Sequence, residues 1–277
     1  METTDLRILQ MEELQMANII VNICQKYNLE YYIMGGTLLG AIRHQGFIPW
    51  DDDLDIGMKR SDYEKFMKIA EYELSAPYSI HHYKNDSSYI YPYIRIQNDS
   101  ISLRRDNTKN KTVQNLWVDI FPLDGVPQGK VQRFAWEKTL YILRGLRNVS
   151  CFDELVNINK EYSGLKKLVV ELAQRYNIQK FFNTNRILAK IDNYLKSWSL
   201  EDNSYIGNPM GGHWFKEVYP KEYYLKTVPV IFEGIELSAP IEYKKVLEKM
   251  YGDYMLLPKE EDRNWHGTSL IKEVKNE

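Results

Sequence analysis

Hydrophobic residues recur every three or four positions over residues 4–27, and this spacing predicts an amphipathic helix. A short apolar run at 31–34 ends at two glycines, and residues 53–58 then alternate polar and apolar side chains as a half-buried strand does. Between them, the segment TLLGAIRHQ (37–45) is predicted to form a brief helix with Thr37 as its N-terminal cap. The chain is therefore expected to begin as helix, strand, helix and strand.

More strands are predicted in the rest of the first half. Ser61 and Glu64 have the spacing of a capping box, which would open a helix over residues 62–74. Strand-like runs separated by turn residues occupy residues 78–105. The segment WVDIF at 117–121 is a further strand, which we expect to end at the proline that follows it.

Helical spacing predominates from about residue 128 to residue 198. The tail that follows combines a strand-like run, VPVIFEGIEL, with a helical one, IEYKKVLEKMYG. Strands in the first half and helices in the second predict an α+β fold, in which a mixed sheet core is flanked by helices and carries a mainly helical elaboration. We expect the core over residues 1–127. Residues 128–277 would form a helical elaboration and a C-terminal segment packed on it, unless the chain is one continuous domain.

Composition narrows the class of protein. The chain has 277 residues, and 36 Lys and Arg against 38 Asp and Glu give a net charge of -2, so no basic field favours nucleic acid as a partner. The N-terminus lacks the basic and apolar segments of a signal peptide, and no apolar run is long enough to span a bilayer. The two cysteines, Cys24 and Cys151, are expected to be buried thiols. These features predict a cytoplasmic protein.

The stretch GFIPWDDDLDIG (46–57) holds four aspartates within five positions. In a strand, Asp51, Asp53 and Asp55 share one face, so their carboxylates converge while the apolar neighbours point to the other face. Like charges this close repel one another unless a hard cation neutralises them. Because oxygen is the only type of ligand present, the pattern predicts Mg²⁺ or Mn²⁺ rather than zinc.

Three other interpretations of the aspartates were compared with a metal site. A solvated acidic turn is the commonest fate of a charge run. It explains Asp51 and Asp52, but not the alternation that follows them. A calcium loop fails, because it requires glycine at its sixth position and glutamate at its twelfth, where this chain has Ile56 and Asp62. Residues 53–55 also form the D-x-D motif of many glycosyltransferases, which is weak evidence when it stands alone.

Two glycines precede the short helix. Gly35 and Gly36 let backbone N–H groups approach a phosphate at the helix N-terminus, and Thr37 completes the predicted phosphate-binding turn. A tight turn without a ligand would explain the glycines alone. Because a strand with two carboxylates follows directly, we favour a phosphate site beside a metal site, which is the arrangement of phosphoryl or nucleotidyl transfer.

Three stretches resemble one known family. GGTLLGAIRHQGFIPWDDDLDIG (35–57) strongly resembles the LicD family and the fukutin-related proteins, which share a nucleotidyltransferase-type fold. WVDIFPLDGVP (117–127) is similar to the second block of that family, and YGDYMLLP (251–258) is similar to a looser C-terminal one. The resemblance implies that residues 1–127 are a nucleotidyltransferase-like catalytic core.

The resemblance also implies roles for three carboxylates. Asp53 and Asp55 match the D-x-D metal ligands, and Asp119 matches the aspartate of the second block, so these three would be the catalytic and metal-binding residues. Asp119 alternates with apolar neighbours in the predicted strand, which would place it on the same face as the other two. Asp124, in the turn-like sequence LDG, is instead predicted to cap local N–H groups.

Members of this family move a phospho-alcohol from a CDP-activated donor to a sugar hydroxyl. The resemblance therefore implies a CDP-alcohol phosphotransferase that depends on Mg²⁺ or Mn²⁺. Phosphocholine from CDP-choline is the favoured group, with ribitol phosphate or glycerol phosphate as alternatives.

The implied acceptor is a teichoic acid, a lipopolysaccharide or another cell-surface glycan precursor. If that acceptor is lipid-linked, weak peripheral contact with the inner face of the membrane is expected. The basic and aromatic segment GKVQRFAWEK (129–138) is the candidate for this contact, although a solvated helix face is the simpler account of it.

Three basic residues are candidates for binding donor phosphates. Arg43 and His44 leave the short helix near the aspartates, but surface groups at a helix end would look the same. Arg95 lies between two isoleucines in a predicted strand, where it would bind a phosphate or pair with a core carboxylate.

Aromatic residues near the motif strands are candidates for contact with choline or with the base. A quaternary ammonium is held by aromatic faces. Trp50, Tyr91, Tyr93 and Trp117 are close to the motifs in sequence and are therefore the predicted contacts. A polyol would need polar groups instead.

Two other classes of function stay open at this point. One is a D-x-D glycosyltransferase that uses a nucleotide sugar, although the motif arrives early in the chain for such an enzyme. The other is an inactive adaptor that keeps the fold to bind glycan precursors. The intact set of carboxylates disfavours the adaptor, because an acidic cluster without a cation destabilises a fold.

Overall fold

The computed structural model of the chain describes residues 3–105, 108, 111–157, 162–164, 167–168, 170–172, 178–260, 263 and 268–271. Its helices are α1 (Thr3–Lys26), α2 (Gly35–His44), α3 (Arg60–Glu73), α4 (Lys130–Ser150), α5 (Phe152–Leu155), α7 (Thr184–Lys196) and α8 (Tyr243–Tyr251), with short 3-10 helices η1 (Ile178–Phe181), η2 (Trp214–Lys216) and η3 (Lys221–Tyr224). Its strands are β1 (Tyr32–Ile33), β2 (Asp55–Lys59), β3 (Tyr78–His81), β4 (Ile94–Arg105), β5 (Val113–Val126), β6 (Tyr205–Gly207), β7 (Val218–Pro220), β8 (Thr227–Phe232), β9 (Ile235–Pro240) and β10 (Thr268–Leu270).

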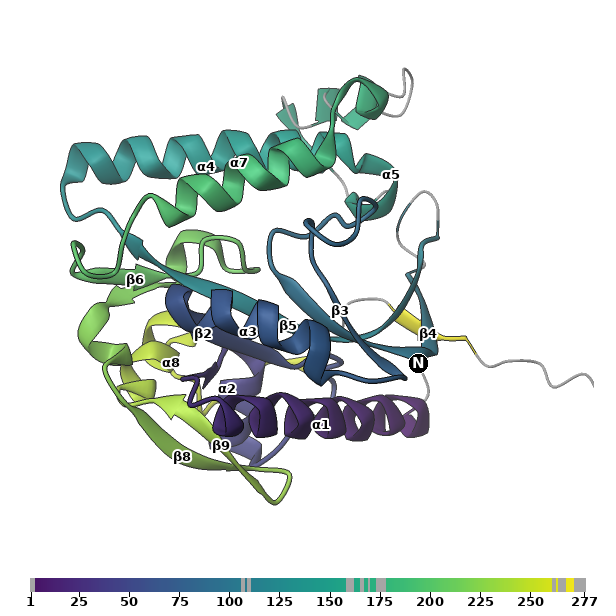
Figure 1. Cartoon of the computed structure of the whole chain (residues 1–277), viewed down its shortest axis with the longest axis vertical. Coiled ribbons are helices and arrows are strands. Elements are labelled where there is room, and N and C mark those ends of the chain that lie inside the picture. Colours follow the sequence, from purple (N-terminus) through teal and green to yellow (C-terminus); the bar gives the residue numbers. More distant parts are fainter. Residues whose placement is uncertain are drawn as a thin grey trace, which may run out of the picture.

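One mixed sheet and one hairpin form the β structure (Figure 1). The sheet has the order β1-β2-β5-β4-β10, with β3 also paired to β4, and β6 and β7 extending it from β5. Strands β2 and β5 are parallel, whereas the other pairs are antiparallel. Strands β8 and β9 form a separate hairpin. A mixed sheet flanked by helices confirms the predicted α+β class.

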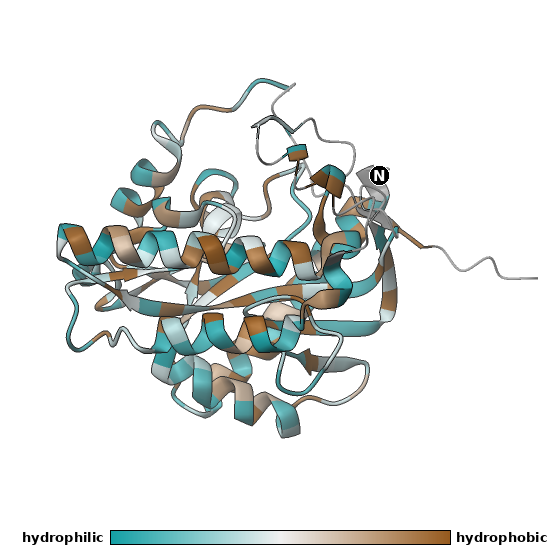
Figure 2. Cartoon of the chain, turned by 90° about the horizontal axis from the view of Figure 1, so that it is seen from above, coloured by the Kyte–Doolittle hydropathy of each residue, from teal (hydrophilic) through white to brown (hydrophobic). Residues whose placement is uncertain are grey.

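Helices pack on the sheet in two groups. α1 and α3 contact each other and β5, and their buried side chains join those of the strands in the main core. α4 and α7 lie side by side above β5 in Figure 1 and form a second core with the end of that strand. Apolar and polar colours alternate along the helices in Figure 2, as expected when one helix face is buried. Among the helices that the structure describes, none is both long and apolar enough to cross a bilayer.

Most of the predicted elements are confirmed. The helices expected over 4–27 and 62–74 are α1 and α3, the run VPVIFEGIEL is the β8–β9 hairpin, and IEYKKVLEKMYG contains α8. Within residues 128–198, α4 and α7 confirm the helical spacing, while part of that range lies outside the described residues.

Both predicted helix caps are wrong. α2 begins at Gly35, and the Thr37 hydroxyl accepts a hydrogen bond from the Asp55 N–H at 2.8 Å instead of capping the helix. α3 begins at Arg60 without a side-chain cap, and Glu64 forms ion pairs with Arg60 and Lys196. Thr37 and Glu64 therefore bind partners other than the helix termini that the capping signals predicted: a strand N–H for Thr37, and basic side chains of α3 and α7 for Glu64.

The predicted end of strand 117–121 at Pro122 is also wrong, because β5 continues to Val126. Pairing of β5 with β4 stops at Ile120, and pairing with β6 starts at Asp124. Pro122 therefore lies where no strand on that side needs its missing N–H.

Asp124 is a buried strand residue and not the cap of a turn. Its side chain is 1% exposed and accepts two hydrogen bonds from Arg60, Nε to Oδ1 at 2.7 Å and Nη2 to Oδ2 at 2.6 Å. Arg60 also donates to Asp192 of α7 at 2.8 Å. This network connects α7 to α3 and to β5 of the sheet.

Candidate functional site

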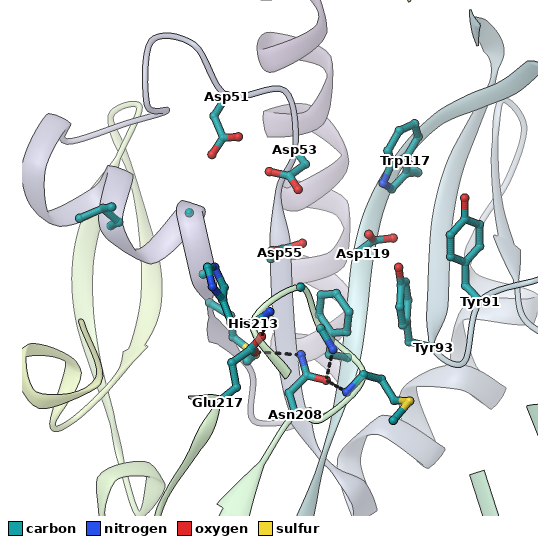
Figure 3. Close-up of a pocket in the computed structure, with 18 of the residues that line it drawn as sticks. Asp51, Asp53, Asp55, Tyr91, Tyr93, Trp117, Asp119, Asn208, His213 and Glu217 are labelled. Carbon is teal, nitrogen blue, oxygen red and sulfur yellow. Dashed lines mark hydrogen bonds between the residues drawn. The ribbon is translucent and has the colours of Figure 1, made fainter. Parts of the chain in front are cut away.

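A cavity of about 620 Å³ opens where the glycine turn, the aspartates and the second half of the chain meet. Figure 3 shows Asp51, Asp53, Asp55 and Asp119 on one side of it, with aromatic side chains of β5 and of the segment before β4 beside them. The opposite side is formed by the loop between β6 and β7 and by Tyr251 of α8. The cavity thus unites parts of the chain that are far apart in sequence.

The turn at the start of α2 has a backbone conformation and close contacts that favour glycine. Gly35 has φ +52, and a Cβ there would come within 3.0 Å of the Asp55 carboxylate. A Cβ on Gly36 would come within 2.5 Å of the Asp51 carboxylate. The two glycines therefore let carboxylates approach the N-terminus of α2, as well as exposing backbone N–H groups there.

The three predicted catalytic aspartates all line this cavity. Asp55 and Asp119 are directly opposite each other in the parallel strands β2 and β5, so their side chains leave the sheet on the same face. Asp53 lies just before β2, and Asp51 also lines the cavity. Asp52 is buried, which removes it from the solvated acidic turn considered above.

The carboxylates of the cavity are not arranged as a complete set of metal ligands. Within the described part of the chain, no three His, Cys, Asp or Glu side chains are close enough together to hold a metal ion. Asp119 is instead paired with Arg95, whose Nε donates to Oδ1 at 2.7 Å. The predicted metal site is thus a set of oxygen ligands that shares one cavity, and Asp119 as third ligand stays a prediction.

Arg95 fills the space between two of the aromatic residues predicted to contact the ligand. Its guanidinium carbon lies 3.6 Å from the centre of the Tyr91 ring and 4.3 Å from that of Trp117. Of the two roles considered for Arg95, pairing with a core carboxylate fits its contacts better than binding a phosphate alone. Arg95 nevertheless also lines the cavity. A choline group would have to share these faces with Arg95 or displace it.

The other predicted contacts are divided between the cavity and its surroundings. Tyr93 packs on Phe121 with ring centres 4.4 Å apart, and both line the cavity together with Trp50. Arg43 and His44 are not among its lining residues: Arg43 donates to His44 at 3.0 Å and to the carbonyls of Tyr254 and Leu256. The helix-end alternative matches these contacts.

Sequence reasoning missed one side of the cavity. Glu217 is buried, and it accepts hydrogen bonds from the Asn208 side chain at 3.1 Å and from the His213 N–H at 3.2 Å. Burial raises the pKa of Glu217 to about 7. A Cβ on Gly211 would come within 2.5 Å of this carboxylate, so Gly211 in NPMGG was a signal in the sequence.

Glu13 of α1 is a second carboxylate that the sequence did not indicate. It is buried, and its pKa is raised well above the usual range, first by burial and then by the negative charges of Asp53, Asp52, Asp51 and Asp55. The negative charge of the clustered aspartates therefore also acts on the buried carboxyl group of Glu13. A protonated Glu13 avoids adding a further negative charge.

Comparison with known proteins identifies the first half of the chain. Residues 28–141 match the family described as "LicD/FKTN/FKRP, nucleotidyltransferase domain". The chain carries a LicD-family domain. The matched range holds the glycine turn, all four aspartates of the cavity and Arg95, so the resemblance seen in the sequence is confirmed where the site is built.

One relative extends the similarity over nearly the whole chain, and others match parts of it. The chain is 29% identical to the lipopolysaccharide cholinephosphotransferase LicD of Haemophilus influenzae over 269 residues, which is 96% of this chain and 97% of that protein. It is 35% identical to an uncharacterised protein of Rickettsia typhi over 52% of this chain and 43% of the relative. Human ribitol 5-phosphate transferase FKRP is 41% identical over 46 residues, 17% of this chain and 9% of that protein.

Proposed function

We propose that this LicD-family protein is a phosphotransferase that moves a phospho-alcohol from a CDP-activated donor to a sugar hydroxyl. Phosphocholine is the favoured group, and a teichoic acid or cell-surface glycan precursor is the acceptor. The observation that carries the proposal is the single cavity in which a glycine turn at a helix N-terminus meets Asp53, Asp55 and Asp119. Similarity to a cholinephosphotransferase along nearly the whole chain supports the choice of group.

The residues of the cavity suit Mg²⁺ or Mn²⁺. Asp51, Asp53, Asp55 and Asp119 offer only carboxylate oxygens, the ligand type that these ions prefer. A donor pyrophosphate at the Gly35–Gly36 turn would lie beside the Asp51 and Asp55 carboxylates, and a cation between these anionic groups would remove their repulsion. When bound, the ion would neutralise charge on the pyrophosphate. Asp53 and Asp55 would hold it, with Asp119 as the proposed third ligand.

The chain itself would supply binding and proton transfer. Backbone N–H groups at the start of α2 would hold donor phosphate oxygens, and the Thr37 hydroxyl fixes the backbone of Asp55. In the transfer step, the acceptor oxygen forms a bond to the alcohol-side phosphorus, the phosphorus–oxygen bond to CMP breaks, and the acceptor hydroxyl loses its proton. Glu217 is suited to accept that proton, because it lines the cavity and Arg95 already pairs with Asp119.

We further propose that the core has a nucleotidyltransferase-type fold, as the description of the matched family suggests. The division into a core over residues 1–127 and an elaboration over 128–277 belongs to the same proposal. The cavity draws residues from both parts, so the second part would complete the site rather than act independently.

A panel of donors tests the proposed function. The protein is incubated with CDP-choline, CDP-ribitol, CDP-glycerol or UDP-sugars, a glycan acceptor and Mg²⁺, and release of CMP or UDP is measured with an EDTA control. Release of CMP that EDTA abolishes is expected, with CDP-choline the best donor. Release of UDP alone would identify the glycosyltransferase alternative, and binding of glycan without any release would identify the adaptor.

The position of Arg95 favours a second candidate group, ribitol or glycerol phosphate. Because its guanidinium covers one face each of Tyr91 and Trp117, it leaves fewer aromatic faces for a quaternary ammonium and adds N–H donors that suit hydroxyl groups. In the donor panel, a higher rate with CDP-ribitol or CDP-glycerol than with CDP-choline would select this candidate.

A further inference from the structure

The outward side of α4 carries an unusual row of exposed apolar side chains. Val131 is 83% exposed, Phe134 62% and Ile142 60%, and Tyr141 and Leu146 are also exposed. Their spacing of three, four or seven residues places them on one side of the helix, together with Lys138. We call Val131, Phe134, Lys138, Tyr141, Ile142 and Leu146 the α4 outer face.

The opposite side of α4 is buried in the molecule. Trp136 and Leu140 belong to the second core, which α7 completes. The helix is therefore apolar on two sides. Tyr141 of the α4 outer face contacts Trp214, with ring centres 6.0 Å apart, whereas Val131, Phe134 and Ile142 stay largely exposed. Exposed apolar groups gathered on one surface usually mark a site of interaction.

The charge of α4 indicates what kind of surface it meets. Among its charged residues, Lys130 and Lys138 are the exposed ones, and both are basic. Arg144 is buried on the inner side, and Arg133 is paired with Glu137. The chain as a whole has a net charge of -2, so this positive charge is local. In a symmetric dimer the same basic face would meet itself and repel, whereas an anionic lipid surface is complementary to it.

We propose that the α4 outer face binds the surface of a membrane that contains anionic lipids. Apolar side chains would enter the interface between headgroups and acyl chains, and Lys130 and Lys138 would lie at the level of the headgroups. Lys138 already lies over the Phe134 ring, 5.2 Å from its centre, so an apolar group and a charge are held together at this surface.

The same helix is connected to the cavity. On its inner side, Arg144 donates to the carbonyls of Pro209 and Gly211 and stacks on Trp214 at 3.6 Å. These residues belong to the loop that forms one side of the cavity. A membrane bound to the α4 outer face would therefore lie about one helix diameter, ~10–12 Å, from that loop, which suits an acceptor carried on a lipid.

Sedimentation with vesicles tests the proposal. The full chain is mixed with vesicles of phosphatidylcholine alone, or with about one quarter phosphatidylglycerol, and the bound fraction is measured. Binding to the anionic vesicles is expected to exceed binding to the neutral ones and to fall with added salt. The double variant Phe134→Ser/Ile142→Ser should lose about tenfold in affinity, and Lys130→Glu/Lys138→Glu should lose binding to the anionic vesicles.

The matched control is Tyr72→Ser, which removes an exposed aromatic residue of α3 that is 66% exposed. It should bind as the unchanged protein does. Equal binding of Phe134→Ser/Ile142→Ser and the unchanged protein would overturn the proposal. It would also be overturned if the unchanged protein does not bind vesicles but forms a dimer that this double variant abolishes. CMP release from soluble donors is measured separately, so failure of the membrane proposal is distinguishable from failure of the proposed function.

Discussion

At the scale of single residues, Asp53 and Asp55 face a cavity and not the core, so their loss should affect chemistry alone. We expect Asp53→Asn and Asp55→Asn to abolish transfer. Without a divalent ion, removal of one of several clustered charges should leave the melting temperature unchanged or slightly higher. Thermal melts in EDTA check this, with the exposed Glu201→Gln as the control. A large fall in melting temperature for either variant would mean that the aspartates are structural.

Asp119 differs from its neighbours because Arg95 depends on it. Both side chains are buried, at 4% exposure for Arg95 and 9% for Asp119. Removal of one partner leaves a buried charge without compensation, which costs about 3–5 kcal/mol. We therefore expect Asp119→Ala to lose both activity and stability, measured as CMP release and as the free energy of unfolding in urea.

The double variant Arg95→Met/Asp119→Leu separates these two effects. It removes both charges, so it should recover much of the stability that Asp119→Ala loses, while transfer stays absent. Normal CMP release by Asp119→Ala would contradict its assignment as a ligand. No loss of stability in that variant would contradict the importance of the ion pair.

Glu217 gives the site a pH dependence of definite sign. Its pKa is raised by burial from 4.5 to about 7, so the folded protein favours the protonated carboxyl group. The stabilising contribution is complete below 4.5 and is lost as the pH rises to about 7, by on the order of 3 kcal/mol. Glu217→Gln should therefore be less sensitive to pH than the unchanged protein in urea unfolding across this range.

The rate of transfer should respond in the opposite direction. If Glu217 accepts the proton, kcat/KM rises with pH through about 7 as the carboxylate forms, and this rise is absent in Glu217→Gln. A Glu217→Gln variant with the rate and pH profile of the unchanged protein would exclude the role. The sequence could not indicate this residue, because its hydrogen-bond partners come from the turn after β6 and its burial from packing.

At the scale of elements, local signals predicted helices and strands well but predicted their ends poorly. Gly125 looked like part of a turn, yet it lies in β5, where a Cβ would come within 2.2 Å of the Ser199 carbonyl oxygen. Its N–H bonds the Trp198 carbonyl at 3.0 Å. Close approach by a segment more than seventy residues away explains this glycine, and no local pattern carries that information.

The network of Arg60, Asp124 and Asp192 allows a prediction about stability at the scale of elements. As a cap, Asp124 would contribute about 1 kcal/mol. As a buried partner of Arg60 between three elements, it should cost about 3–5 kcal/mol when changed to Ala. Urea unfolding of Asp124→Ala checks this, with Glu73→Gln, which removes an exposed ion pair with Lys26, as the control that should change little. A loss near 1 kcal/mol for Asp124→Ala would contradict the network.

At the scale of the whole molecule, the sequence predicted half of the cavity. The glycine turn and the aspartates are close together in the chain, and strand alternation placed Asp119 beside Asp55 correctly. The opposite side could not be predicted, because it depends on long-range pairing: β6 pairs with β5, which is about eighty residues earlier in the chain, and β7 pairs with β6. Tyr251 of α8 joins it, and its pKa is raised by burial and then by both Asp55 and Glu217.

If the cavity holds the proposed cation and nucleotide side by side, it should bind them cooperatively. The proposed ion would neutralise the aspartates that face the glycine turn, so Mg²⁺ should strengthen binding of CDP-choline, and the nucleotide should strengthen binding of Mg²⁺. At about 100 times the dissociation constant, a ligand stabilises the native state by about 2.7 kcal/mol. For a chain of this size that corresponds to a rise in melting temperature of roughly 5–10 °C. Melting curves with Mg²⁺ alone, CDP-choline alone and both should show a combined shift larger than the sum of the two, and Asp53→Asn should lose it. Equal shifts by CDP-choline with Mg²⁺ and with EDTA would place the nucleotide away from the aspartates.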